Sequence, residues 1–281
     1  MKHDNKAKAF TKEQSGNGPK LVLNTYTGAS REGEAFVTDH IFSCIISGSH
    51  DVWIAGRKYS FKKGDCRFFK RNQLAKYVKN TAEGGFKSIA IHIDQLTLKE
   101  MSRRHNIVDQ KEYQGDELLW VDQNIQLKAF IDSLIHYSAA TKPSDSIVSL
   151  KTQELILLLM QNDLRFKHIL FDFSEPAKID LEPFMNRHYR YNVSLKGFAF
   201  LTGRSLSAFK RDFEKLFQIS PGKWLTQKRL QEAKFRIEEK REKPTQIYPE
   251  LGFQDLSHFS YAYKKAFGYA PNKSIQINKN Q

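Results

Sequence analysis

The sequence predicts an α+β protein with an N-terminal antiparallel β-barrel of cupin or jelly-roll type, further helices, and then an all-α domain. Three observations predict this order. Short alternating apolar segments come first, apolar residues at helical spacing follow, and the last hundred residues contain an internal repeat. The 281 residues are 40 % hydrophobic and 27 % charged, which is typical of globular protein and excludes collagen-like and largely disordered classes.

The N-terminal residues 1–20 are rich in Lys, Asn, Gln and Gly and have no apolar period, so we expect a flexible tail. They lack the apolar core of a signal peptide, and no run approaches the roughly 18 apolar residues of a membrane helix. We therefore expect a cytoplasmic protein with no membrane partner.

Strand signals extend from Leu21 to about Ile93. Val52 and Ile54 share a face with Tyr59 and Phe61 across the turn at 55–57, and isoleucines alternate with other residues over 89–93. Short antiparallel strands joined by turns predict the small barrel or jelly roll.

The chain has two cysteines, which cannot form a disulfide framework or a four-thiolate zinc site. Cys44 lies within an apolar run, and we interpret it as an ordinary core residue.

Helical periodicity follows over 122–139 and 145–162. The second helix is apolar almost all round, so it packs either within its own chain or against another subunit. We assign residues 21–172 to a first domain, 173–179 to a polar linker, and 180–281 to a second domain.

Positive charge is concentrated in the second domain. Residues 181–281 contain 19 Lys and Arg against 9 Asp and Glu, whereas the rest of the chain has 26 against 22. A surface of this sign attracts polyanions such as nucleic acid.

The basic segment contains a duplicated unit, because residues 206–221 shifted by fifty match residues 256–271. The matched pairs are Leu206 and Leu256, Ser207 and Ser257, Phe209 and Phe259, Phe213 and Tyr263, Lys215 and Lys265, Phe217 and Phe267, and Pro221 and Pro271.

Each copy predicts two helices joined by a tight turn. In the first copy Ser194 and Ser205 can cap helices on either side of Gly203. The inward positions of the second helix are Phe209, Phe213 and Leu216, and the opposite face carries Ser207, Lys210, Arg211 and Glu214. A helix held on its aromatic face and basic on the other fits a DNA major groove about 12 Å wide.

In the second copy Asp255 can cap a helix after the turn at Gly252. Its inward residues are Phe259, Tyr263 and Phe267, and its outward residues are Ser257, His258, Tyr261 and Lys265. A central helix beginning at Ser220-Pro221 separates the copies. If it sets them about 34 Å apart, one chain reads two successive major-groove segments.

Several motifs together resemble the signature of AraC/XylS-type transcription regulators over about residues 180–275. They are Ile219-Ser220-Pro221 with Trp224-Leu225, Arg229-Leu230 with Ala233, Leu251-Gly252-Phe253, Ser257-His258-Phe259, and Phe267-Gly268-Tyr269-Ala270-Pro271. The resemblance implies two helix-turn-helix units that bind adjacent major grooves of promoter DNA and recruit RNA polymerase, with an N-terminal domain that senses an effector and dimerises.

Position by position, the resemblance implies base-reading residues in both units, and we add phosphate contacts at basic positions. The base-reading candidates are Ser207, Lys210, Arg211, Ser257, His258 and Tyr261, and the phosphate candidates are Arg204, Lys215 and Lys265. The second unit departs from the family pattern at Ile247-Tyr248-Pro249, where proline predicts a short or late-starting helix.

The overall arrangement, including the segment 184–189, is also loosely similar to activators of type III secretion genes. The effector is therefore either a small molecule or a regulatory protein. His40, His50 and His92 stand apart in the sequence, so we expect no metal site, no cofactor and no catalytic residues.

The leading hypothesis is a sequence-specific DNA-binding transcription regulator, an activator, and not an enzyme. The alternatives are a sequence-blind architectural DNA-binding protein and a cupin-type enzyme with a basic docking domain.

Overall fold

The computed structural model describes residues 18–277 except 29, 108–112, 114, 141 and 142. The predicted tail falls mostly on residues 1–17, outside the described residues, and the first strand already begins at Lys20. The described chain divides into two compact units with a boundary between Ser174 and Glu175, and residues 33–36 group with the second.

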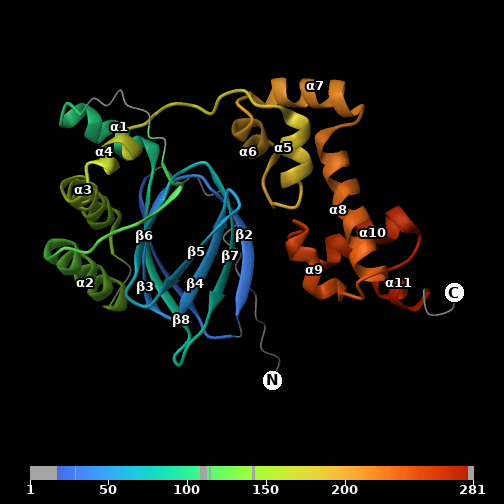
Figure 1. Cartoon of the computed structure of the whole chain (residues 1–281), viewed down its shortest axis with the longest axis horizontal. Helices are drawn as coiled ribbons and strands as arrows, with labels where there is room; N and C mark the ends of the chain where they lie inside the picture. The colour runs from blue at the N-terminus through green and yellow to red at the C-terminus, as the bar shows by residue number, and fades with distance from the viewer. Residues whose placement is uncertain (1–17, 29, 108–112, 114, 141–142, 278–281) are drawn as a thin grey trace. The chain divides into compact units, whose positions relative to one another are not determined.

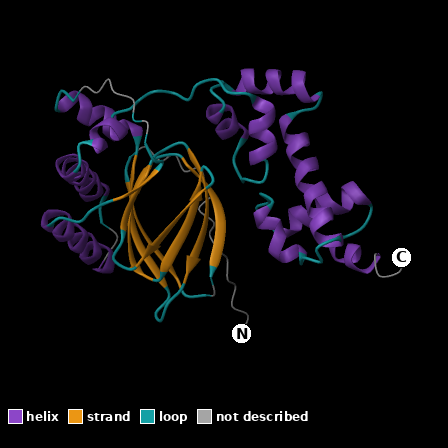
Figure 2. Ribbon diagram, in the orientation of Figure 1, coloured by secondary structure: helices purple, strands orange, loops and turns teal. Residues whose placement is uncertain are grey.

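The first unit is built on antiparallel strands, as predicted. They form a five-stranded sheet in the order β1-β8-β3-β6-β9 and a four-stranded sheet in the order β2-β7-β4-β5. The strands are two layers and not one closed barrel (Figures 1 and 2). The bounds are β1 Lys20–Tyr26, β2 Arg31–Val37, β3 His40–Ser47, β4 Ser49–Ile54, β5 Arg57–Lys62, β6 Cys66–Phe69, β7 Gln73–Asn80, β8 Phe86–Ile93 and β9 Leu118–Trp120.

Four helices cover the outer face of the five-stranded sheet (Figure 1). They are α1 Gln95–Arg104, α2 Ile125–Ala140, α3 Asp145–Asn162 and α4 Arg165–Leu170. The isoleucines of β8 pack with Leu127 and Phe130 of α2 and with Leu155 and Leu159 of α3 in one core. The predicted helices thus correspond to α2 and α3, whereas α1, α4 and β9 are short elements that the periodicity did not reveal.

The interpretation of Cys44 as an ordinary core residue needs correction. Cys44 on β3 lies directly opposite Cys66 on β6, with the Cα atoms 4.2 Å apart, and the two side chains form a disulfide. Both are buried in the core. The bond depends on the register of two strands that are 22 residues apart in sequence, which the spacing alone does not reveal.

The second unit is helical. Its elements are α5 Leu181–His188, α6 Leu195–Leu201, α7 Leu206–Phe217, α8 Pro221–Glu238, α9 Pro244–Glu250, α10 Leu256–Phe267 and α11 Pro271–Ile277. The repeat found in the sequence is present in space, because α7 and α10 begin and end at positions fifty residues apart. Both helices end at a left-handed residue, Gln218 with φ 60° and Gly268 with φ 84°.

The expected shortening of the first helix in the second helix-turn-helix unit is wrong. The helix α9 has seven residues, as has its counterpart α6, and it begins with Pro244 in its first turn. Pro249 is the sixth of these seven residues, so its missing N–H affects only the end of the helix. Tyr248 is accommodated beside the core of this unit, with its ring 6.5 Å from that of Phe259.

Candidate nucleic-acid interface

The helix α7 has one buried aromatic side and one exposed polar side. The Ser205 hydroxyl accepts a hydrogen bond from the Ala208 backbone N–H at 3.2 Å and so caps the helix. Phe209 and Phe213 are completely buried. Leu216 was predicted to face inward, but it is 45 % exposed because it lies at the margin of the apolar stripe.

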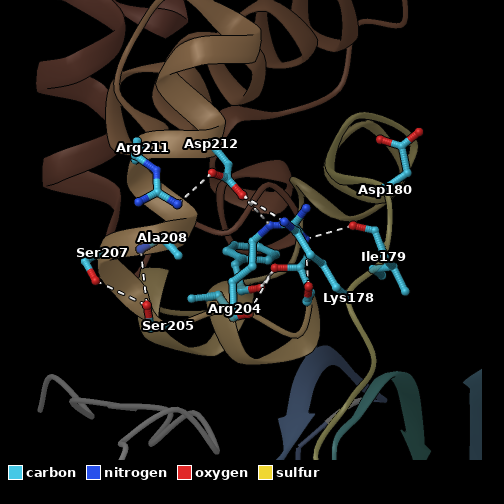
Figure 3. Close-up of polar contacts among 12 residues, drawn as sticks. Lys178, Ile179, Asp180, Arg204, Ser205, Ser207, Ala208, Arg211 and Asp212 are labelled. Atoms are coloured by element: carbon cyan, nitrogen blue, oxygen red, sulfur yellow. Dashed lines mark hydrogen bonds and ion pairs between the residues drawn. The ribbon is translucent and has the colours of Figure 1, made fainter.

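The exposed side of α7 carries the predicted base-reading residues Ser207, Lys210 and Arg211. The Arg211 side chain is 77 % exposed and makes one contact of 3.3 Å with Asp212. Figure 3 shows Ser207 and Arg211 on the side of the helix away from Arg204 and Ile179. Lys215 is exposed as well. These side chains are accessible to a DNA groove.

Arg204 is far less exposed than Arg211, because only 8 % of its side chain is accessible. Its guanidinium donates to Asp212 at 3.2 Å and to the carbonyl oxygens of Ile179 and Thr202 at 2.8 and 2.7 Å (Figure 3). The hydrogen bond from Arg204 holds the pKa of Asp212 below its usual value. This guanidinium therefore ties α7 to the segment before α5, and its Nε and Nη1 atoms donate to protein acceptors.

The helix α10 repeats the arrangement of α7 with other side chains. The Asp255 carboxylate accepts a hydrogen bond from the His258 backbone N–H at 2.6 Å and caps the helix. Phe259 and Tyr263 are buried, as predicted. The outward positions Ser257, His258 and Lys265 are exposed, and Tyr261 is 69 % exposed.

The two helix-turn-helix units differ in the ion pairs that hold their helices in place. The positions that match Arg204 and Asp212 in the second copy are Gln254 and Ala262, so the ion pair of the first unit has no counterpart there. In the second helix-turn-helix unit, Arg236 of α8 forms ion pairs with Glu242 and, at 2.7 Å, with Glu250 at the end of α9.

Arg229 of α8 joins the turn before α10 to the loop after α5. Its guanidinium donates to the carbonyl oxygens of Tyr189, Tyr191 and Gly252 at 2.8, 2.8 and 3.0 Å. Burial lowers the pKa of Arg229 to about 10, so the group stays charged at neutral pH. Gly252 has φ +76°, and a Cβ atom there would lie 2.7 Å from the Arg229 guanidinium carbon. The arginine and the glycine of the signature thus fit each other.

Sequence reasoning missed the roles of Arg204, Asp212 and Arg236. The loss of the fifty-residue match at 254 and 262 was the one available signal for the first two, because it marks positions where the copies are stabilised differently. The role of Arg236 depends on how the loop between α8 and α9 brings Glu242 and Glu250 back to α8, which no local sequence pattern reveals.

Among the described residues, no group of three His, Cys, Asp or Glu side chains is placed to hold a metal ion. Each helix among them is too short or too polar to span a bilayer. His40 is buried and accepts a hydrogen bond from the Arg71 backbone N–H at 3.2 Å, and His50 is buried on β4.

Comparison with known proteins identifies both units. A family model described as a helix-turn-helix domain matches residues 198–276, and one described as the ExsA N-terminal regulatory domain matches residues 40–169. The chain therefore contains an AraC-type helix-turn-helix domain and an N-terminal domain of the ExsA regulatory type.

Two relatives show how far along the chain the likeness extends. The HTH-type transcriptional regulator ExsA of Pseudomonas aeruginosa is 29 % identical over 133 residues, which are 46 % of this chain and 48 % of ExsA. The thermoregulatory protein LcrF of Yersinia pestis is 28 % identical over 241 residues, which are 82 % of this chain and 86 % of LcrF. A solved structure of ToxT from Vibrio cholerae aligns with 92 % of the chain at 12 % identity and a TM-score of 0.42.

Proposed function

We propose that this chain is an AraC-family regulator that binds promoter DNA sequence-specifically through α7 and α10 and activates transcription with RNA polymerase in the cytoplasm. The observation that supports this most is the pair of helices whose bounds lie fifty residues apart. Each has a side-chain cap at its N-terminus, a left-handed residue at its C-terminus, one buried aromatic side and one exposed polar side. Two solvated surfaces with no common role have no reason to share all these features.

In this proposal Arg211 and Lys210 contact base edges from α7, with Ser207 beside them. Ser257, His258 and Tyr261 do so from α10, and Lys215 and Lys265 contact phosphates. We leave Arg204 out of the contact set, because its side chain is 8 % exposed and its Nε and Nη1 donors are engaged within the protein.

The test compares two alanine variants in full-length protein. Arg211→Ala should weaken binding to the chain's own upstream DNA by about 1 to 3 kcal/mol and relax base choice at one position. Lys215→Ala should weaken cognate and random DNA alike and reduce the salt slope by about 1. Arg103→Ala, an exposed arginine on α1, is the matched control and should change neither.

Binding should be measured by fluorescence anisotropy across a salt series with unlabelled random competitor. If wild-type binding vanished with the competitor, the sequence-blind architectural hypothesis would replace ours. If Arg211→Ala weakened cognate and random DNA equally, Arg211 would be removed from the base-reading set.

We also propose that α3 forms a dimer interface. Val148, Leu155 and Leu159 are buried within the unit, whereas Leu150 is 65 % and Leu157 is 44 % exposed. The exposed leucines are seven residues apart and therefore lie on one side of the helix. Leu150→Glu should convert a dimer to a monomer in sedimentation equilibrium. Leu96→Glu, at a leucine of α1 that is 50 % exposed, is the matched control and should leave the dimer intact. A wild-type chain that is monomeric at high concentration would contradict the interface.

The first unit is proposed to respond to an effector, in keeping with the regulatory domain that it resembles. The sequence left open whether this effector is a small molecule or a protein.

A further inference from the structure

Asp212 of α7 contacts two arginines that have very different surroundings. Its Oδ2 atom accepts a hydrogen bond from Nε of Arg204 at 3.2 Å, and its Oδ1 atom accepts one from Nη2 of Arg211 at 3.3 Å (Figure 3). The Arg204 side chain is 8 % exposed, whereas that of Arg211 is 77 % exposed. One carboxylate therefore links a buried guanidinium to a guanidinium on the surface that we propose for DNA.

The buried end of this chain of contacts is fixed by the protein backbone. The Nη1 atom of Arg204 donates to the carbonyl oxygens of Ile179 and Thr202 at 2.8 and 2.7 Å. The Lys178 ammonium lies 3.6 Å from the same Oδ2 atom of Asp212 that Arg204 contacts. Hydrogen bonds between a charged donor and a charged acceptor are stronger than those between neutral groups. The Asp212 carboxylate is therefore held in one orientation, which leaves its Oδ1 atom at a defined place.

A defined acceptor matters for Arg211, because an exposed arginine has many rotamers and ordering it on DNA costs conformational entropy. Supporting hydrogen bonds that already restrict such a side chain lower this cost. The guanidinium has five N–H donors, so one contact with Asp212 leaves others for a base. The arginine fork matches the O6 and N7 acceptors of guanine in the major groove. The geometry thus favours guanine over the other bases as the partner of Arg211.

The second helix-turn-helix unit supplies an independent observation. The positions that match the two arginines and the carboxylate carry other side chains there, which are Gln254, Tyr261 and Ala262. Tyrosine has a rigid ring and only two side-chain torsions, so it presents a contact surface without a carboxylate to hold it. Where the exposed arginine is replaced, the carboxylate and the buried arginine are replaced as well, as expected if the three residues act as one unit.

We propose that Asp212, held by Arg204, is a positioning residue that orients Arg211 to read one guanine in the DNA segment under α7. Arg211 donates to the O6 and N7 atoms of that guanine, and Asp212 acts on base preference only through Arg211. This inference deepens the proposed DNA-binding function and rests on it.

The first part of the test measures base preference with full-length protein. Single-base variants of the chain's own upstream DNA compete for binding in fluorescence anisotropy. One base pair should lose its preference in Arg211→Ala, and the wild type should prefer guanine there by about 5- to 150-fold. Arg211→Lys keeps a positive charge but lacks the fork, so it should lose most of this preference while keeping the salt dependence.

Asp212→Asn then tests the positioning role. The amide has one oxygen where the carboxylate has two, so it can keep the bond from Arg204 while it presents an NH2 group to Arg211. We expect the guanine preference to fall at least about threefold, with no effect of Asp212→Asn on the base preferences that remain in Arg211→Ala. Glu214→Gln removes a negative charge from an exposed position of the same helix. As the matched control, it should change the affinity for all sequences alike and leave the guanine preference intact.

Three results would overturn the inference. One is a preferred base other than guanine at the pair that depends on Arg211. Another is an Asp212→Asn protein that binds every base variant more weakly by the same factor, since a purely structural role has that effect. The third is a loss of preference spread over several base pairs and still present in the Arg211→Ala background.

Two further measurements separate this inference from the function on which it rests. Arg204→Met breaks the same chain of contacts one step further from the DNA and should lower the guanine preference too, with circular dichroism at the assay temperature showing that each variant is folded. The guanine preference of the wild type and of Arg211→Lys is measured with Asp212 intact. A wild-type protein without any base preference would contradict the proposed function itself, whereas a selective wild type with an unaffected Asp212→Asn would contradict only the role of Asp212.

Discussion

Replacing Arg229 by methionine tests how the helical unit is held together. The substitution keeps most of the apolar stem and removes the donors to three carbonyl oxygens, those of Tyr189, Tyr191 and Gly252. Losing a buried charged hydrogen bond and leaving its acceptor unsatisfied costs about 1 to 3 kcal/mol, and three bonds to one group are not additive. We therefore expect a loss of about 3 to 5 kcal/mol in the free energy of unfolding.

The measurement is urea unfolding followed by circular dichroism, together with footprinting on promoter DNA. Because two of the acceptors precede α6 and the third lies in the turn before α10, Arg229→Met should reduce protection under both α7 and α10. Lys223→Met, an exposed position on the same helix, is the control and should change stability by less than about 0.5 kcal/mol. A loss below about 1 kcal/mol for Arg229→Met, with both halves of the footprint intact, would refute the reasoning.

Three further outcomes follow from the described contacts. Asp212→Asn should weaken the attachment of α7 to the segment before α5. The hydrogen bond from Arg204 lowers the pKa of Asp212, so in acid unfolding curves its contribution to wild-type stability should be present above about pH 4 and be lost as the pH falls below it. A variant with the same acid midpoint as wild type would contradict this. Tyr263→Phe removes a hydrogen bond of 2.7 Å to the buried Ser274 hydroxyl and should cost about 1 to 2 kcal/mol by urea unfolding, whereas Tyr261→Phe on the exposed side should cost almost nothing. The Cys44–Cys66 disulfide is buried, so the folded protein should resist dithiothreitol at concentrations that reduce the unfolded protein, as followed by alkylation and mass; rapid labelling of the folded chain would disprove that protection.

The helix-turn-helix units were predictable because their signals are local. Caps, turn glycines and aromatic residues at helical spacing occur within about twenty residues of each other, and the duplication repeats them. The bounds of α7 and α10 confirm this reasoning. Leu216 was misassigned because a residue at the edge of an apolar stripe depends on what packs beside it.

The features that were missed depend on non-local register. The Cys44–Cys66 bond requires two strands to pair at one position, and whether nine strands close or separate into layers is decided at their edges. The burial of Arg67 on β6, where it is 2 % exposed, was not predicted for the same reason, since the sequence does not show that both faces of this strand are covered. Pro249 was misjudged because the end of α9 could not be located in advance.

The 18 residues of α8 set the distance and rotation between α7 and α10 as well as connecting them. At 1.5 Å and 100° per residue it extends about 27 Å, and adding one residue would advance one reading helix by 1.5 Å while turning it by about 100° relative to the other. DNA turns by only about 34° per base pair at 10.5 pairs per turn, so no shift of the second half-site by a single base pair compensates for that rotation. In the proposed complex, the length of α8 therefore fixes the spacing and rotation between the two base-reading helices.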